Sequence, residues 1–457
     1  MIIVLTALLM SMWVLTISWG ALLEFLLFTA AGAGILFLLL KRTRRNATYI
    51  YLVLMLVYGC YVFFCHYIRC INGWEIIGSL DGGGYYIPCT LELSALNSWR
   101  EIWTTTWEVT RYQPGGAIFF YFVPIKHLAD WLQMDLHLAM QISLMPFAAM
   151  ICVVEYYILS SFGIGDKPAV WWSIGFGILS ALFWLSSFIV RDLPICLAYA
   201  IVVSLIFSDA SRTRKLLIGS AMVAIAASIR LASGMGLVPL ALLGVFGDSK
   251  KRTIKPWQTI CCIAITIAII VGHGFIDELE EVSDSYFAIE QEDQGGGSTL
   301  SSFNALPFGI SHIVKTLYAQ IHPVPAWRNM TPFPPDGARL YAYNITHFPD
   351  IWIVFFRIAA VVTLFYGCFK RQLREKIFEN KLLLYSCLYA LLILCAQAST
   401  IEERRKLAVY PLLLIPVVLS WSDMDRSMKK SVMLFSFLLY FLVQLAFLIR
   451  PIFQAGM

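Results

Sequence analysis

The sequence contains few charged residues: Asp, Glu, Lys and Arg make up 14% of its 457 residues, against about 25% in a typical soluble domain. Its eleven cysteines are scattered, and none forms a CxxC or Cys/His spacing of the kind that binds metal. No long basic run interleaved with aromatic residues accompanies the net charge of +5. No period of 20–50 residues repeats clearly. These absences argue against a soluble domain, a cysteine-based metal site, a nucleic-acid partner and an obvious inverted transporter repeat.

The chain is instead rich in apolar residues, at 59% of the total, with a mean hydropathy of +0.73. A helix that crosses a membrane needs about 20 mostly apolar residues. The first apolar run lacks a basic start and a second run follows at once, so we do not read it as a signal peptide. We predict an all-α, polytopic bundle of about 13 crossings in the plasma (inner) membrane. The predicted segments are 2–19, 23–40, 48–68, 137–160, 169–189, 194–208, 216–229, 232–247, 258–275, 351–369, 381–399, 407–421 and 431–450.

The basic residues predict which side of the membrane each connection faces, because Lys and Arg gather in cytoplasmic loops. Residues 69–115 and 276–350 then lie outside, and the ten acids against three bases in 276–350 support this orientation. Residues 114–135 are apolar enough to enter the membrane, but counting them as a full crossing would invert everything between 161 and 250. We therefore predict a re-entrant or surface helix there. The clusters placed inside are 41–45, 211–215, 249–252, 370–376 and 425–430.

This topology predicts five parts of the chain. They are N-terminal transmembrane helices (1–68), a first extracytoplasmic loop with an amphipathic or re-entrant helix (69–136), a central transmembrane module (137–275), a second extracytoplasmic loop (276–350) and C-terminal transmembrane helices (351–457).

Several ionisable residues fall where predicted helices meet the outer interface. An ionised group at the bilayer centre costs about 2.5–3.5 kcal/mol, so such groups snorkel outward, pair with one another or line a wet cavity. Each arginine taken alone is more simply a helix-end anchor. As a set they suit an anionic ligand, because the planar guanidinium matches phosphate oxygens. The arginines predicted to hold a lipid-linked phosphate are Arg191, Arg230, Arg404 and Arg405, and Asp192 adjoins the first of them.

The stretch "DGGGYY" carries the one acid of this set that we predict to be catalytic. Asp81 would accept a proton from an attacking hydroxyl, the glycines would let a bulky ligand approach, and Tyr85 and Tyr86 would stack against sugar. The alternative is a plain turn, with Asp at its first position and Gly supplying a positive φ.

The order of these features resembles the GT-C superfamily of integral-membrane glycosyltransferases, which use polyprenyl-phosphate-linked sugars. The resemblance rests on the acid in the first external loop, on "RYQPGGAIFFYF" (111–122), on 162–207 with its Arg191–Asp192 turn, on the turn at Arg230 and on "EERRKLAVYP" (402–411). It implies a polyprenyl-phosphate sugar donor and a glycan, lipid or protein acceptor. The family's acid often belongs to a "DE", "DD" or "DxD" pair, whereas Asp81 stands alone, so the pattern leaves a divalent metal in doubt.

Two further interpretations stay open. A polysaccharide polymerase or ligase would use histidines and arginines of the second loop, where His312, His322, His347, Arg328 and Arg339 lie. A lipid-linked-sugar flippase or other transporter would carry charged residues buried in its helices, of which Glu155 is the main example.

Overall fold

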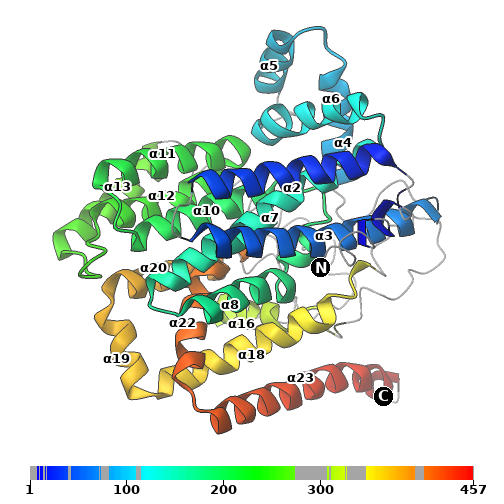
Figure 1. Ribbon diagram of the computed structural model, residues 1–457. Coiled ribbons are helices and arrows are strands. Elements are labelled where there is room, and N and C mark those ends of the chain that lie inside the picture. The colour runs from blue at the N-terminus through cyan, green and yellow to red at the C-terminus, as the bar shows by residue number, and fades with distance from the viewer. Residues whose placement is uncertain are drawn as a thin grey trace. The chain divides into compact units, whose positions relative to one another are not determined.

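The computed structural model describes most of the chain as helix (Figure 1). The described part holds α-, π- and 3-10 helices and one isolated bridge between Asp248 and Thr253, with no strand, which confirms the all-α prediction. The described residues are 8–9, 11–13, 16, 18–39, 43–71, 73, 82–109, 115–272, 306–307, 310–324, 326, 346–396 and 406–455.

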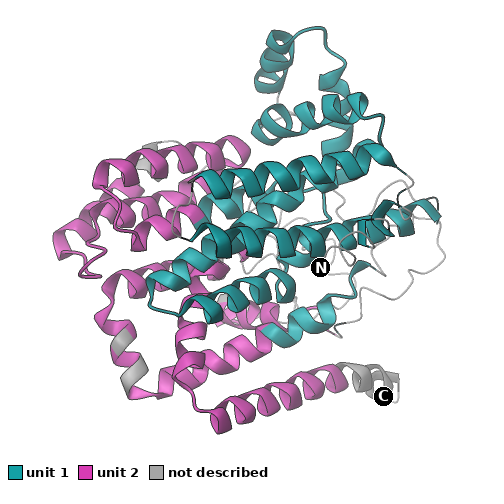
Figure 2. Cartoon of the chain, viewed as in Figure 1, with its two compact units in different colours: residues 1–200, 326–356 teal, residues 201–325, 357–457 magenta. Residues whose placement is uncertain are grey.

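The chain divides into two compact units (Figure 2). Unit 1 comprises residues 1–200 and 326–356, and unit 2 comprises 201–325 and 357–457. The boundaries fall inside α10 (Asp192–Phe207) and α18 (Asp350–Phe369). The other elements of unit 1 are α2 (Trp19–Leu39), α3 (Arg44–Ile71), the π-helix η1 (Gly82–Tyr86), α4 (Ile87–Ser94), α5 (Trp99–Glu108), the π-helix η3 (Ile118–Phe122), α6 (Val123–Trp131), α7 (Leu136–Ser161), α8 (Asp166–Leu179) and α9 (Leu182–Leu185).

Unit 2 is built from apolar helices of 12 to 18 residues and the long last helix. These elements are α11 (Arg212–Ile229), α12 (Leu231–Phe246), α13 (Pro256–Gly272), α16 (Ile310–Ile321), α19 (Arg371–Glu379), α20 (Lys381–Ala396), the 3-10 helix η6 (Leu407–Val409), α22 (Tyr410–Asp423) and α23 (Arg426–Ala455), of which the nine-residue α19 is shorter and charged.

Five helices in the described part are long and apolar enough to cross a membrane. Several shorter apolar helices accompany them, and apolar side chains such as Leu434 and Phe437 of α23 are exposed, as expected of a surface that faces lipid. The chain therefore has the features of a membrane protein, and the number of crossings stays a prediction. The five spans are Trp19–Leu38, Arg44–Ile71, Leu136–Ser161, Asp350–Phe369 and Arg426–Ala446.

Helices α3 and α7 pack antiparallel along the middle of unit 1. At one end, Asn46 Nδ2 donates to Tyr156 Oη at 3.0 Å; at the other, Arg69 Nη2 lies 2.8 Å from Asp135 Oδ1. We call these the Asn46 end and the Arg69 end. Because Arg69 and Asp135 meet, the connection from α3 to α7 begins and ends at the same end of this helix pair. This is compatible with the prediction that 114–135 makes no net crossing, which stays a prediction.

Within that segment, residues 116–131 are helical and pack beside α7. Tyr121 donates its hydroxyl to the carbonyl of Ser143 and its ring lies 5.1 Å from that of Phe147. Phe147 lies well inside α7, so this segment runs along the spanning helix instead of resting only on its end. Whether this segment is a re-entrant or a surface helix stays a prediction.

The predicted segment 169–189 is not one continuous helix. Helix α8 ends at Leu179 and Ser180 is extended, with φ −118° and ψ 175°. The Ser180 Oγ accepts the N–H of Leu182, the first residue of the short helix α9, at 3.3 Å. Serine side chains compete for backbone hydrogen bonds in this way, and hydropathy alone does not register that competition.

Candidate functional site

The stretch after Asp81 forms a turn of π-helix that leads into α4. The alternative of a plain turn with glycines at positive φ does not hold for residues 82–86: the positive-φ glycines of the described part are Gly73 and Gly163. Gly82 is needed for close packing, because a Cβ there would lie 3.1 Å from the Cβ of Ile189 and 3.3 Å from its carbonyl oxygen. Asp81 itself lies outside the described residues.

The two tyrosines predicted to bind sugar differ in accessibility. Tyr86 is only 3% exposed, and its ring packs 5.2 Å from that of Phe122. Tyr85 is partly exposed and meets Tyr86 edge-on at 5.1 Å. Tyr86 therefore belongs to the packed interior of unit 1, and Tyr85 is the one with a ring surface that a ligand could reach.

The predicted Arg191–Asp192 turn lies in unit 1, beside the start of η1. Ile189, which contacts Gly82, precedes Arg191 by two residues. Asp192 is buried at the first position of α10, where the positive end of the helix dipole stabilises a carboxylate. Arg191 is partly exposed. The structure thus brings the residue after Asp81 next to the turn that carries Arg191.

A polar cluster that sequence reasoning missed lies at the Arg69 end. The Arg69 guanidinium pairs with Asp135 and donates to Nδ1 of His66 at 3.4 Å. His137 Nδ1 donates to Gln141 Oε1 at 3.2 Å, and the Gln141 amide donates to the carbonyl of Ser187 in the turn before Arg191. We call His66, Arg69, Asp135, His137 and Gln141 the Arg69 cluster. Its signal in the sequence was the i, i+3 and i, i+4 spacing of polar residues near helix ends.

The charge of Asp135 is stabilised within this cluster. Burial raises the pKa of its carboxyl, but the Arg69 guanidinium and the backbone N–H of Leu138, which donates at 2.9 Å, outweigh burial and bring the pKa below its ordinary value. Asp135 is therefore ionised at neutral pH and caps the start of α7.

A buried histidine–aspartate pair lies just before and at the start of α18. His347 Nδ1 donates to Asp350 Oδ2 at 3.1 Å, and both side chains are almost fully buried. The imidazole packs 5.6 Å from the ring of Trp184 and 5.4 Å from that of Phe188. The pair therefore lies against the same turn of unit 1 that leads to Arg191.

The other predicted arginines are distributed differently. Arg230 belongs to unit 2, where it forms by itself the reversal between α11 and α12 and its N–H donates to Ala226 O at 2.8 Å. Arg404 and Arg405 lie outside the described residues, as do Arg328 and Arg339. Lys406, which follows Arg405, is fully buried in unit 2 and was not singled out from the sequence.

Two glutamates are buried in apolar helices. Glu24 of α2 and Glu155 of α7 are each inaccessible to solvent, and their carboxylate oxygens have no hydrogen-bond partner among the described residues. Glu155 was expected from the sequence and Glu24 was not. Buried acids of this kind are the feature that the transporter interpretation requires.

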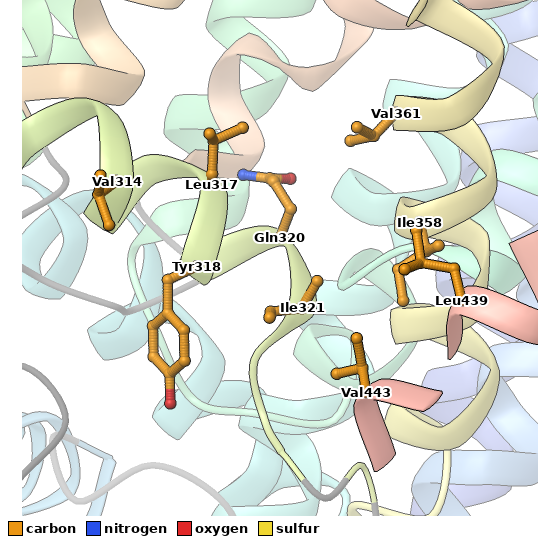
Figure 3. Close-up of a pocket in the computed structure, with 9 residues that line it drawn as sticks. All are labelled: Val314, Leu317, Tyr318, Gln320, Ile321, Ile358, Val361, Leu439 and Val443. Atoms are coloured by element: carbon orange, nitrogen blue, oxygen red, sulfur yellow. The ribbon is translucent and has the colours of Figure 1, made fainter. Parts of the chain in front are cut away.

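Unit 2 contains an apolar pocket of about 430 Å³ between α16, α18 and α23 (Figure 3). Its lining is mostly aliphatic, with the Gln320 amide and Tyr318 as the polar groups, so it suits hydrocarbon better than sugar. The lining residues are Val314, Leu317, Tyr318, Gln320, Ile321, Ile358, Val361, Leu439 and Val443.

No group of three or more His, Cys, Asp or Glu side chains within the described ranges could hold a metal ion. Since Asp81 is not among those residues, a metal beside it stays untested. Comparisons with protein-family models, curated proteins and solved structures found no match. The functional argument therefore rests on the geometry of the chain itself.

Proposed function

We propose that the chain is an integral-membrane glycosyltransferase of the GT-C type. It transfers a sugar from a polyprenyl-phosphate carrier to a glycan, lipid or protein acceptor on the extracytoplasmic face of the plasma membrane. The observation that carries the proposal is the contact between Gly82 and Ile189, which joins the residue after Asp81 to the turn bearing Arg191 and Asp192. The Arg69 end lies away from the basic cluster 41–45, which supports an extracytoplasmic site.

In the proposed reaction, the acceptor hydroxyl oxygen attacks the anomeric carbon of the sugar. The bond from that carbon to the phosphate oxygen breaks, and its electron pair leaves with the polyprenyl phosphate. Asp81 takes the proton of the hydroxyl, a contribution worth roughly 10²–10⁴ in rate. Arg191 stabilises the charge that develops on the departing phosphate. The phosphate-binding roles of Arg230, Arg404 and Arg405 stay predictions from the sequence.

The test uses the full chain in proteoliposomes with radiolabelled undecaprenyl-phosphate sugars and a lipid extract of the host as acceptor. Asp81→Asn is expected to lower the rate at which the sugar leaves its carrier by roughly 10²–10⁴-fold. Arg191→Lys should lower it less, since Lys keeps the charge but loses the planar fork. The matched control is Glu108→Gln, which neutralises an exposed acid of α5.

Full activity of Asp81→Asn would refute the assignment of the base. Movement of the labelled lipid between leaflets with its sugar still attached would favour the flippase instead, and Glu24→Gln and Glu155→Gln would then be expected to stop that movement.

A second candidate, a polysaccharide polymerase or ligase, is favoured by the buried His347–Asp350 pair. A carboxylate on Nδ1 fixes the imidazole tautomer and makes Nε2 the proton acceptor, an arrangement common to histidine bases. If this candidate holds, His347→Gln and Asp350→Asn abolish the reaction while Asp81→Asn leaves it unchanged. His127→Gln, at an exposed position of α6, serves as the control.

A further inference from the structure

Helix α5 carries a row of three tryptophans that neither the proposed chemistry nor the Arg69 cluster uses. Trp99, Trp103 and Trp107 recur every fourth residue, so they lie along one side of the helix. We call them the aromatic stripe. The residues next to them on the wheel, Ile102 and Thr106, are buried. On the opposite side, Glu101 and Glu108 are exposed and Thr104 is partly exposed, while the exposed Arg100 borders the stripe.

The stripe packs edge-on against two phenylalanines of η3. Trp99 and Trp103 lie 6.0 Å and 5.0 Å from the ring of Phe119, at interplanar angles of 85° and 82°. Trp107 lies 6.5 Å from the ring of Phe120. These contacts hold the rings in place but leave much of them uncovered: Trp99 is 52% exposed, Trp103 46% and Phe120 58%. Figure 1 labels α5, which packs on α4 and η3.

Helix α5 packs on η3, and η3 in turn contacts the first half of α7. Tyr121, adjacent to Phe120, bonds to the carbonyl of Ser143 on α7. Gln141, two residues earlier on α7, bonds to Ser187 in the connection between α8 and α10. Gln141 and Ser143 lie in the first half of α7, which is long and apolar enough to cross a membrane, so the segment on which α5 packs lies toward the Arg69 end of that helix.

We propose that the aromatic stripe of α5 inserts into the membrane interface at the Arg69 end, at the boundary between headgroups and acyl chains. Trp is enriched at that level, where an amphipathic ring meets both media. A helix with Trp on one side and charged residues on the other lies in the plane of the interface. Two basic side chains border the stripe: Arg100 is exposed beside Trp107 on the wheel, and the His127 ring lies 5.5 Å from that of Trp99. At the level of the headgroups both would face lipid phosphates. This inference goes beyond the proposed function and does not depend on it.

Insertion of the aromatic stripe would also fix the depth of η1 and α4 in the membrane interface. Helix α5 packs on α4 and on η3, and η1 runs directly into α4. Anchoring the stripe in lipid therefore fixes the depth of the segment that begins one residue after Asp81.

The test is photo-crosslinking with p-benzoylphenylalanine placed at Trp103, compared with the same probe at Thr104 on the polar side of the helix. The full chain is irradiated in nanodiscs of phosphatidylethanolamine and phosphatidylglycerol and in native membranes. The expected result is a phospholipid adduct on the α5 peptide from position 103, detected by mass spectrometry, in large excess over position 104. Equal lipid yield at the two positions would overturn the proposal, as would a carbohydrate or protein adduct at position 103.

A second measurement keeps the proposal testable if the crosslinking variants fold poorly. Trp103→Phe retains the packing on Phe119 and removes one indole. Tryptophan fluorescence of the native chain and of this variant is compared in nanodiscs with and without dibrominated phosphatidylcholine. The difference between the two proteins isolates Trp103, and we expect strong quenching when the bromines lie near the headgroups. An unquenched difference would show that Trp103 does not contact lipid.

Discussion

Among single residues, Arg69 and Asp135 form the ion pair that joins α3 to α7 in unit 1. Their contact ties the last turn of α3 to the N-cap of α7, and it shows that the long outer segment leaves and returns at one end of this helix pair. The Arg69 side chain is mostly buried, so its charge requires a partner. The pair is therefore a structural clamp between α3 and α7.

The clamp predicts a dependence of stability on pH. The native pKa of Asp135 lies below its ordinary value, so its ionisation contributes to stability above the unfolded pKa of about 4 and that contribution is lost as pH falls through the native pKa. We expect the melting temperature of the chain in detergent to fall more steeply below pH 4 than that of Asp135→Asn. Identical slopes for the two proteins in this range would show that the pair is not formed.

Among the elements, α2 shows how a spanning helix is positioned by a single close approach. Gly20 stands at its start, and a Cβ there would lie 2.3 Å from the carbonyl oxygen of Leu132, in the connection between α6 and α7. The Leu132 carbonyl belongs to the backbone, so it cannot move aside as the end of a flexible side chain could. Small residues at such crossings let helices approach closely in membranes, so the glycine sets where α2 docks on the outer segment.

The same helix offers a matched pair of substitutions. We expect Gly20→Ala to lower the free energy of unfolding by about 1–3 kcal/mol, the usual cost of overpacking. Gly34→Ala, at a position where the added Cβ meets nothing within 4 Å, should be neutral or stabilising. Thermal unfolding in detergent compares the two. Equal midpoints would mean that α2 does not dock on Leu132.

For the molecule as a whole, the contacts of unit 1 predict a topology that can be measured. Residues Asn97 and Gln133 flank the segment predicted to be a re-entrant or surface helix. Gln133 precedes α7 at the Arg69 end, whereas Gly163 follows α7 at the other end. Fusions to alkaline phosphatase, which needs an oxidising compartment for its disulfides, should be active after Asn97 and Gln133 and inactive after Gly163.

Opposite results at Asn97 and Gln133 would show that the intervening segment crosses the membrane. Activity after Gly163 alone would show that the Arg69 end faces the cytoplasm. That second outcome would remove the basis for an extracytoplasmic sugar transfer, because polyprenyl-phosphate donors would then have to act on the inner face.

Most helix positions could be predicted from the sequence, and much of the candidate site could not. The predicted segments 48–68 and 137–160 correspond to α3 and α7 within a few residues, since hydropathy and length are local properties. The break at Ser180 and the π-helix at 82–86 were not foreseen, because each depends on a particular side-chain bond or close packing contact. The Arg69 cluster was missed for the same reason: its members lie on different helices.

By itself, the sequence determined that the chain belongs in a membrane, that it is helical, and which loops are expected on the cytoplasmic side. These follow from the cost of placing charge and unpaired backbone groups in hydrocarbon, which acts on every residue independently of its distant neighbours. Only the tertiary structure decided that Gly82 meets Ile189, that Arg69 meets Asp135 and that His347 meets Asp350. Such pairings depend on how helices pack, and packing is a property of the assembled chain.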